Sequence, residues 1–293
     1  MIFRTDLALE ENEKLQTKVE GVESFEQEIN DCKITHIRIT NETAAEKLHK
    51  PQGNYITIEV PAISDHIDGK DEYTRLAAQE LQKLLPKSGF VLVVGLGNRD
   101  ITPDALGPKA LELLFATRHI QGELARVTGM EGLRPVAAIS AGVLGNTGID
   151  AFELLQALVE KLKPDAVIAI DALASRNLAR LGCTVQMSDA GIAPGAGVGN
   201  ARPQISLQTL GVPVISMGVP TVVDAATLAA DLLTSDEDQM EKLKEELAPR
   251  GAQMVVTPRE IDLLISRAAK LIAMAINTTL NPKFTVEEFL SLV

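Results

Sequence analysis

An unbroken apolar run occupies Phe90-Val91-Leu92-Val93-Val94-Gly95-Leu96-Gly97-Asn98, and a second run, Ala166-Val167-Ile168-Ala169-Ile170, ends at Asp171. Strands that are buried on both faces of a parallel sheet have sequences of this kind, because neither side of the strand meets water. Parallel sheets of α/β proteins gather their active sites beyond the carboxyl ends of the strands. The two runs therefore predict such a sheet and direct attention to the residues that follow them.

An aspartate follows each of the two runs. Asp104 lies in Thr102-Pro103-Asp104-Ala105-Leu106-Gly107-Pro108, shortly after the first run, and Asp171 directly follows the second. If the two strands are parallel neighbours, both carboxyl groups face one crevice, where they are able to share a proton and activate a water molecule. Hydrolysis is therefore the first functional hypothesis.

Both aspartates also have a purely structural interpretation. Thr102 suits a helix cap, Pro103 suits the first helical position, and an acidic residue in the first turn favours the helix dipole. Asp171 is equally suited to cap the chain as it leaves its strand. The position of the aspartates after the strands leaves the catalytic and the structural interpretation open.

Strands and helices alternate from Phe90 to the C-terminal region. This alternation predicts an α/β fold, with a mostly parallel sheet flanked by helices on both faces in a three-layer sandwich. The expected strands span residues 90–95, 135–140, 166–171 and 212–217, with a possible fifth at 253–257, and the expected helices span 105–116, 149–162, 224–233 and 258–276.

We interpret residues 1–293 as a single domain with four parts. Residues 1–30 are polar and acidic with little periodicity, so we expect them to wrap the surface. Residues 31–88 contain two half-exposed strands, at 34–39 and 55–60, and helices at 42–49 and 72–85. The core sheet spans 89–280, with a charged exposed helix at 237–247, and residues 281–293 form a short closing helix.

The composition excludes several classes of protein. The 293 residues carry a net charge of −12 and only 3% aromatic residues, which disfavours direct contact with nucleic acid. Cys32 and Cys183 form no metal-binding or disulfide pattern. With no signal peptide and no apolar stretch of about 18 residues, we expect a cytoplasmic protein that does not enter a membrane.

Glycine-rich loops follow the expected strands. We expect main-chain groups there to contact substrate or to stabilise an oxyanion, because glycine allows backbone to approach a ligand closely. Tight turns under packed helices are the alternative for the loop at 142–148, whereas the long loop at 189–200 favours a functional role. The residues expected to contribute are Gly95, Gly97, Asn98, Gly142, Gly145, Gly195, Gly197 and Gly199.

Known cofactor motifs do not fit the chain. In Gly95-Leu96-Gly97-Asn98-Arg99-Asp100 an aspartate stands where a dinucleotide fingerprint has its third glycine. A nucleotide-binding alternative stays open because Asp171 ends a strand as a ribose-binding acid would. The sequence has no P-loop, zinc-protease or serine-hydrolase motif, and its four histidines are scattered. We therefore expect no cofactor and no metal.

The whole set of motifs resembles the spore germination protease family, endopeptidases that degrade small acid-soluble spore proteins during germination. A more distant resemblance links the glycine loops and aspartates to hydrogenase maturation proteases, which have an α/β sandwich fold and leave a metal-dependent peptidase as an alternative. The matching motifs are Arg4-Thr5-Asp6-Leu7-Ala8-Leu9-Glu10, residues 95–98, 102–108, 169–173 and 194–200, Gly218-Val219-Pro220-Thr221-Val222-Val223-Asp224 and Val256-Thr257-Pro258-Arg259-Glu260-Ile261-Asp262.

The resemblance implies an atypical aspartic endopeptidase in which Asp104 and Asp171 match the proposed catalytic pair. It further implies a zymogen, a homotetramer, and a location in the cytoplasm of the spore core. Because only Met1, Ile2 and Phe3 precede the Arg-Thr-Asp motif, we expect a propeptide to be nearly absent. In the expected mechanism one aspartate is the base and the other the acid. Their division of labour stays open, although a helix N-terminus favours an ionised Asp104 and hence Asp104 as the base.

Overall fold

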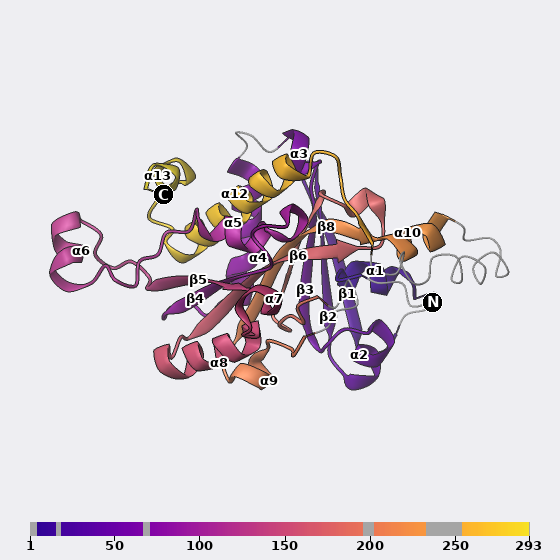
Figure 1. Cartoon of the computed structure of the whole chain (residues 1–293), viewed down its shortest axis with the longest axis horizontal. Helices are drawn as coiled ribbons and strands as arrows, with labels where there is room; N and C mark the ends of the chain where they lie inside the picture. Colours follow the sequence, from indigo (N-terminus) through magenta and orange to yellow (C-terminus); the bar gives the residue numbers. More distant parts are fainter. Residues whose placement is uncertain (1–4, 16–18, 67–70, 196–201, 233–253, 293) are drawn as a thin grey trace.

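The computed structural model describes residues 5–15, 19–66, 71–195, 202–232 and 254–292. In these residues the strands form one nine-stranded sheet with the order β1-β2-β3-β7-β8-β6-β4-β5, and β9 pairs with β8 (Figure 1). The strands are β1 (Val22–Ile29), β2 (Cys32–Ile39), β3 (Gly53–Glu59), β4 (Val91–Leu96), β5 (Val136–Gly142), β6 (Ala166–Ser175), β7 (Thr184–Ser188), β8 (Val214–Asp224) and β9 (Val255–Val256).

The sheet is mixed. Strands β5, β4, β6 and β8 run parallel to one another, whereas β1, β2, β3, β7 and β9 pair antiparallel with their neighbours. The expected α/β fold is confirmed, and its parallel part is the block of four strands that the apolar runs predicted. Strand β7 turns back because the connection at residues 176–183 is too short for a parallel crossover.

Helices cover both faces of the sheet (Figure 1). One face packs against α4, α5 and α12, and the other against α8 and α9, with α1 and α2 over β2 and β3. The helices are α1 (Ala8–Glu13), α2 (Glu42–Leu48), α3 (Ile63–His66), α4 (Asp71–Leu84), η1 (Thr102–Asp104), α5 (Leu106–Leu111), α6 (Gly122–Thr128), α7 (Leu144–Thr147), α8 (Ala151–Leu162), η2 (Leu178–Arg180), α9 (Leu207–Leu210), α10 (Ala225–Leu232), α12 (Ile261–Leu280) and α13 (Val286–Leu292).

Helix α5 is shorter than the sequence predicts. The buried side chain of Asn277, on α12, ends it: Asn277 Oδ1 accepts the Phe115 N–H at 3.0 Å and its Nδ2 donates to the Leu113 carbonyl at 3.0 Å. These bonds take the place of the helical bonds that the Phe115 N–H and the Leu113 carbonyl would otherwise make. The helix expected at 237–247 lies outside the described residues.

Helix α12 is long and apolar enough to cross a membrane by length and composition. However, 67% of its most apolar window is buried, and it packs against α4 and α5 inside the protein. These contacts are those of a core helix in an α/β sandwich.

The N-terminal part of the chain differs from the sequence expectation. Residues 1–30 were expected to wrap the surface without regular structure, but they include helix α1 and the edge strand β1. Leu7, Ala8 and Leu9, at the start of α1, are buried. The low periodicity arises because α1 buries acidic side chains, Glu10 and Glu11, along with the apolar ones. A search for an apolar stripe alone misses such a helix.

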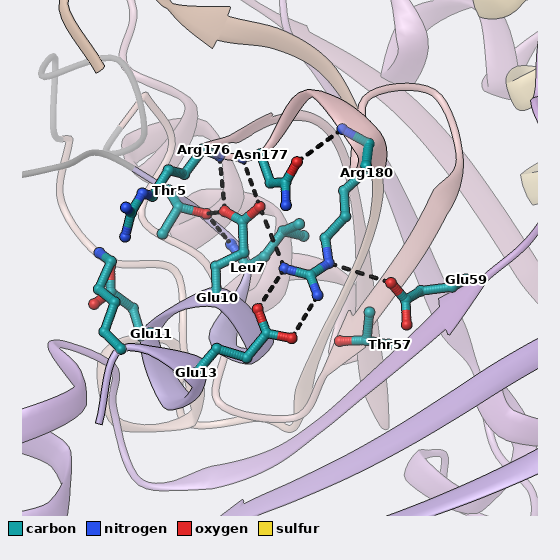
Figure 2. A network of polar contacts seen from close by, with 12 residues as sticks. Thr5, Leu7, Glu10, Glu11, Glu13, Thr57, Glu59, Arg176, Asn177 and Arg180 are labelled. Atoms are coloured by element: carbon teal, nitrogen blue, oxygen red, sulfur yellow. Dashed lines mark hydrogen bonds and ion pairs between the residues drawn. The ribbon is translucent and has the colours of Figure 1, made fainter. Parts of the chain in front are cut away.

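The buried Glu10 of α1 bonds the segment that follows β6, and Arg180 of that segment also binds Glu13 of α1 and Glu59 of β3 (Figure 2). Glu10 accepts the main-chain N–H groups of Arg176 at 2.7 Å and Asn177 at 2.9 Å. Arg180 forms two hydrogen bonds with Glu13, at 2.8 and 2.6 Å, and a third with Glu59 at 3.3 Å. Burial would lower the pKa of Arg180, but these carboxylates raise it, so the guanidinium stays charged.

Replacing Arg180 should therefore destabilise the fold. Arg180→Met removes the cation beside the buried Glu10 carboxylate and beside the more exposed Glu13 and Glu59. Loss of one partner of a fully buried ion pair costs roughly 3 kcal/mol or more, and the exposure of Glu13 and Glu59 reduces this, so we expect a loss of about 2 kcal/mol. The free energy of unfolding in urea measures this loss.

Arg38→Met is the matched control. Its ion pair with Glu23, at 3.9 Å, joins side chains that are both more than half exposed, so its loss should change the unfolding free energy by less than about 1 kcal/mol. Equal losses in the two variants would contradict the importance that we give to the Arg180 network.

Candidate active site

Two glycines bring helix α5 against the parallel strands. A Cβ atom on Gly107 would lie 2.3 Å from the carbonyl oxygen of Leu96, on β4, and 2.7 Å from that of Ile170, on β6. A Cβ atom on Gly95 would in turn lie 2.6 Å from the main chain of Gly107. Only glycine permits this approach, and it sets η1, which carries Asp104, beside β6.

The turn after β4 positions the carboxylate of Asp104. Gly97 has φ +103°, and a Cβ atom there would lie 2.1 Å from the Asp104 carbonyl oxygen. The main-chain N–H of Asn98 donates to Asp104 Oδ2 at 2.7 Å. Asp104 also lies in the first turn of η1 after Pro103, as the structural interpretation expected, and its carboxylate is held by the loop before that helix.

Asp171 lies inside β6, which continues to Ser175 beyond the apolar run. Its main chain pairs with Gly218 on β8, and its side chain is only 6% exposed. The carboxyl group accepts the N–H of Ala172 at 2.9 Å. Because the strand continues past Asp171, this residue does not cap a strand end.

The two carboxyl groups interact electrostatically. Burial raises the pKa of Asp171 well above its ordinary value, and the charges of Asp104 and then Asp6 raise it further. Burial also raises the pKa of Asp104, but the hydrogen bond from Asn98 opposes the rise. Asp171 therefore holds its proton more strongly, and Asp104 is the carboxyl that ionises first.

Sequence reasoning gave Asp6 no role at this site. The Asp6 N–H donates to the carbonyl of Ala174 at 2.8 Å, and Asp6 Oδ2 accepts the Ala174 N–H at 2.8 Å. Asp6 is thus bonded to β6 at Ala174, three residues beyond Asp171. Its position in the motif at residues 4–10 was visible in the sequence, but its contact with β6 depends on the tertiary fold.

The residues that the sequence suggested as contacts for substrate or an oxyanion lie in different environments. Gly95 is buried within β4 and pairs with Ile170, so its role is close packing rather than contact with substrate. The Asn98 N–H is occupied by Asp104. Gly142 ends β5 beside Leu96, at the same end of the parallel strands as the aspartates.

The remaining glycines lie in loops. Gly145 lies exposed on the short helix α7, and Gly195 is half-buried at the start of the long loop, with φ +75°. Gly197 and Gly199 lie outside the described residues. A surface hollow over β1–β3, lined by Phe25, His36 and Tyr55 among others, includes neither aspartate.

Gly97→Ala should impair both stability and activity. The substitution forces a side chain into a positive-φ conformation and against Asp104, at an expected cost of roughly 2 kcal/mol or more in unfolding free energy. Because the Asp104 carboxylate must shift, kcat should fall by more than about tenfold. Urea unfolding and a peptidase assay measure the two effects.

Gly145→Ala provides the control, because a Cβ atom there has no described atom within 4 Å and φ is not positive. Its unfolding free energy should stay the same or rise by up to about 1 kcal/mol. Normal activity of Gly97→Ala would refute the role of this turn in placing Asp104.

Comparisons with known proteins identify the family of the chain. The family described as germination protease matches residues 2–235. The germination protease of Clostridium perfringens (strain 13) is 44% identical over 97% of both chains, and that of Priestia megaterium is 37% identical over 97% of this chain and 93% of its own.

A solved [NiFe] hydrogenase maturation protease, HycI from Thermococcus kodakarensis, aligns with 67% of this chain and 98% of its own at 15% identity, with a TM-score of 0.37. The matches in sequence cover the motifs around Asp6, Asp104 and Asp171. The chain belongs to the germination protease family and is a peptidase of spore germination.

Proposed function

We propose that the chain is an aspartic endopeptidase in which Asp104 and Asp171 activate water for cleavage of small acid-soluble spore proteins. The observation that carries the proposal is a pair of interacting carboxyls, one buried and one half-buried, on segments that glycines bring together. Family membership supplies the peptidase activity and its setting in germination.

The difference in pKa between the two groups supports a division of labour. Asp104, held by the Asn98 N–H, ionises first and takes a proton from the attacking water. Asp171, buried and next to two acidic groups, stays protonated and donates to the oxygen of the scissile carbonyl as negative charge develops there. The sequence favoured the same assignment because of a helix N-terminus, and the hydrogen bond from the Asn98 N–H adds support for it.

The substrate proposal rests on the family. Small acid-soluble spore proteins are the proposed substrates, and the spore-core cytoplasm is the proposed location. The proposed homotetramer and zymogen form also come from the resemblance. Incubation with a purified small acid-soluble spore protein, followed by mass spectrometry of the products, tests for cleavage at internal peptide bonds.

Asp104→Asn and Asp171→Asn should each lower kcat/KM by at least about 10²-fold, because each removes one partner of the proton transfer. The same assay on the intact substrate measures the loss. Asp100→Asn, an exposed aspartate four residues before Asp104, is the control and should keep normal activity. Near-normal cleavage by both active-site variants would refute the proposed mechanism.

Asp171→Asn should also stabilise the protein at neutral pH. The raised pKa of Asp171 contributes stability below the ordinary pKa of a free aspartate, and this contribution is lost as pH rises through the raised value. An asparagine has no carboxyl to ionise, so its unfolding free energy relative to the native protein should increase with pH. Urea unfolding at several pH values measures this trend, and a constant difference would contradict the burial of an ionisable Asp171.

Two alternatives predict different results. A nucleotide-binding protein would show a thermal shift with nucleotides and no cleavage of spore proteins. A metal-dependent peptidase would lose activity after exhaustive chelation and regain it when the metal is restored.

A further inference from the structure

The N-terminal segment occupies an edge of β6 that β4 leaves open. Pairing between β4 and β6 ends at Gly95 and Ile170, because the chain turns away at Gly97. Four residues farther along β6, both main-chain groups of Ala174 are bonded by Asp6, one through its N–H and one through its carboxylate. Asp6 therefore extends the hydrogen bonding along this edge of β6, close to the proposed catalytic pair.

The buried side chain of Gln186 also binds the N-terminal segment. Gln186 Nε2, on β7, donates to the Asp6 carbonyl at 2.8 Å, and Gln186 Oε1 accepts the Ala8 N–H at 3.1 Å. Gln186 pairs with Gly218 on β8, which pairs with Asp171 on β6. Asp6 and Asp171 are thus fixed to the same region of the sheet by main-chain and side-chain bonds.

Further contacts anchor the segment at both sides of Asp6. Glu10 caps the N–H groups of Arg176 and Asn177 just beyond β6, and Thr5 donates to Glu10 (Figure 2). Lys50 Nζ donates to the Thr5 carbonyl at 3.0 Å. The position of Asp6 is therefore overdetermined, as expected for a residue whose placement affects a catalytic group.

The charges around Asp6 come from three parts of the chain. Lys50 follows α2, Glu10 and Glu11 lie on α1, and Asp171 lies on β6. Burial lowers the pKa of Lys50 and the charge of Asp6 opposes this effect, whereas the same charge raises the pKa of Asp171. The charge of Asp6 thus affects the pKa of both Lys50 and Asp171.

We propose that Asp6 is a positioning residue of the active site, which fixes β6 through Ala174 and whose negative charge keeps Asp171 in the proton-donating role. The inference rests on the proposed aspartic mechanism. It assigns a catalytic purpose to the contact between the N-terminal segment and β6, beyond the stability that this contact provides.

Asp6→Asn is the sharpest test, because asparagine has the same shape and retains an oxygen that can accept the Ala174 N–H. Loss of the charge lowers the pKa of Asp171, so Asp171 gives up its proton at lower pH. The alkaline limb of the pH profile of kcat/KM should therefore move to lower pH, while kcat at the optimum changes by less than about tenfold.

Glu46→Gln is the matched control, since it removes the same charge from an exposed position on the nearby helix α2. Its alkaline limb should stay in place. An unshifted alkaline limb in Asp6→Asn would overturn the inference, because a purely structural contact would alter stability and leave the limb unchanged.

Three other variants keep the outcomes distinct. If Asp6→Asn does not fold, Asp6→Ser removes the charge with a smaller side chain and should show the same shift. Asp104→Asn and Asp171→Asn are assayed in parallel. If they remain active, the aspartic mechanism fails; if they are inactive and the Asp6 variants show no shift, only the role of Asp6 fails.

Discussion

The first turn of α5 lies closer to strands β4 and β6 than any side chain at Gly107 would allow. A Cβ atom there would overlap the carbonyls of both strands, and Gly95 leaves the matching space on β4. This contact sets η1 against β6 and thereby brings Asp104 to Asp171. The rest of the site follows from it: Gly97 turns the chain, Asn98 holds the carboxylate of Asp104, and the two acids interact.

The burial of Asp171 lowers the stability of the fold but favours the proposed proton donation by this residue. A carboxyl that is 6% exposed and next to two other acids is costly to ionise. This cost reduces the free energy of unfolding at neutral pH, but a protonated carboxyl is the form that can donate to a developing oxyanion. The apolar strands and the core helix α12 supply the compensating stability, since they bury a large apolar surface on both sides of the sheet.

The parallel strands and the two aspartates could be predicted because the signals are local: continuous apolar runs followed by acids. Strand β7 could not, since its Thr184, Gln186 and Ser188 are polar and yet buried. Gln186 bonds Asp6 and Ala8 of the N-terminal segment, so its burial is explained only after that segment has been placed. Helix α1 and the role of Asp6 could not be predicted for the same reason. Their hydrogen-bond partners are more than 160 residues away in the chain, beyond the reach of any periodicity argument.

The site therefore depends on a segment that reaches it from the start of the chain. Asp6 binds β6 beyond the last residue that pairs with β4, and Gln186 and Glu10 hold the segment on either side. If the segment separates from β6, the Ala174 N–H loses its acceptor and Asp171 loses a neighbouring charge in the same event. The placement of the N-terminal segment and the protonation of the proposed catalytic pair are thus linked.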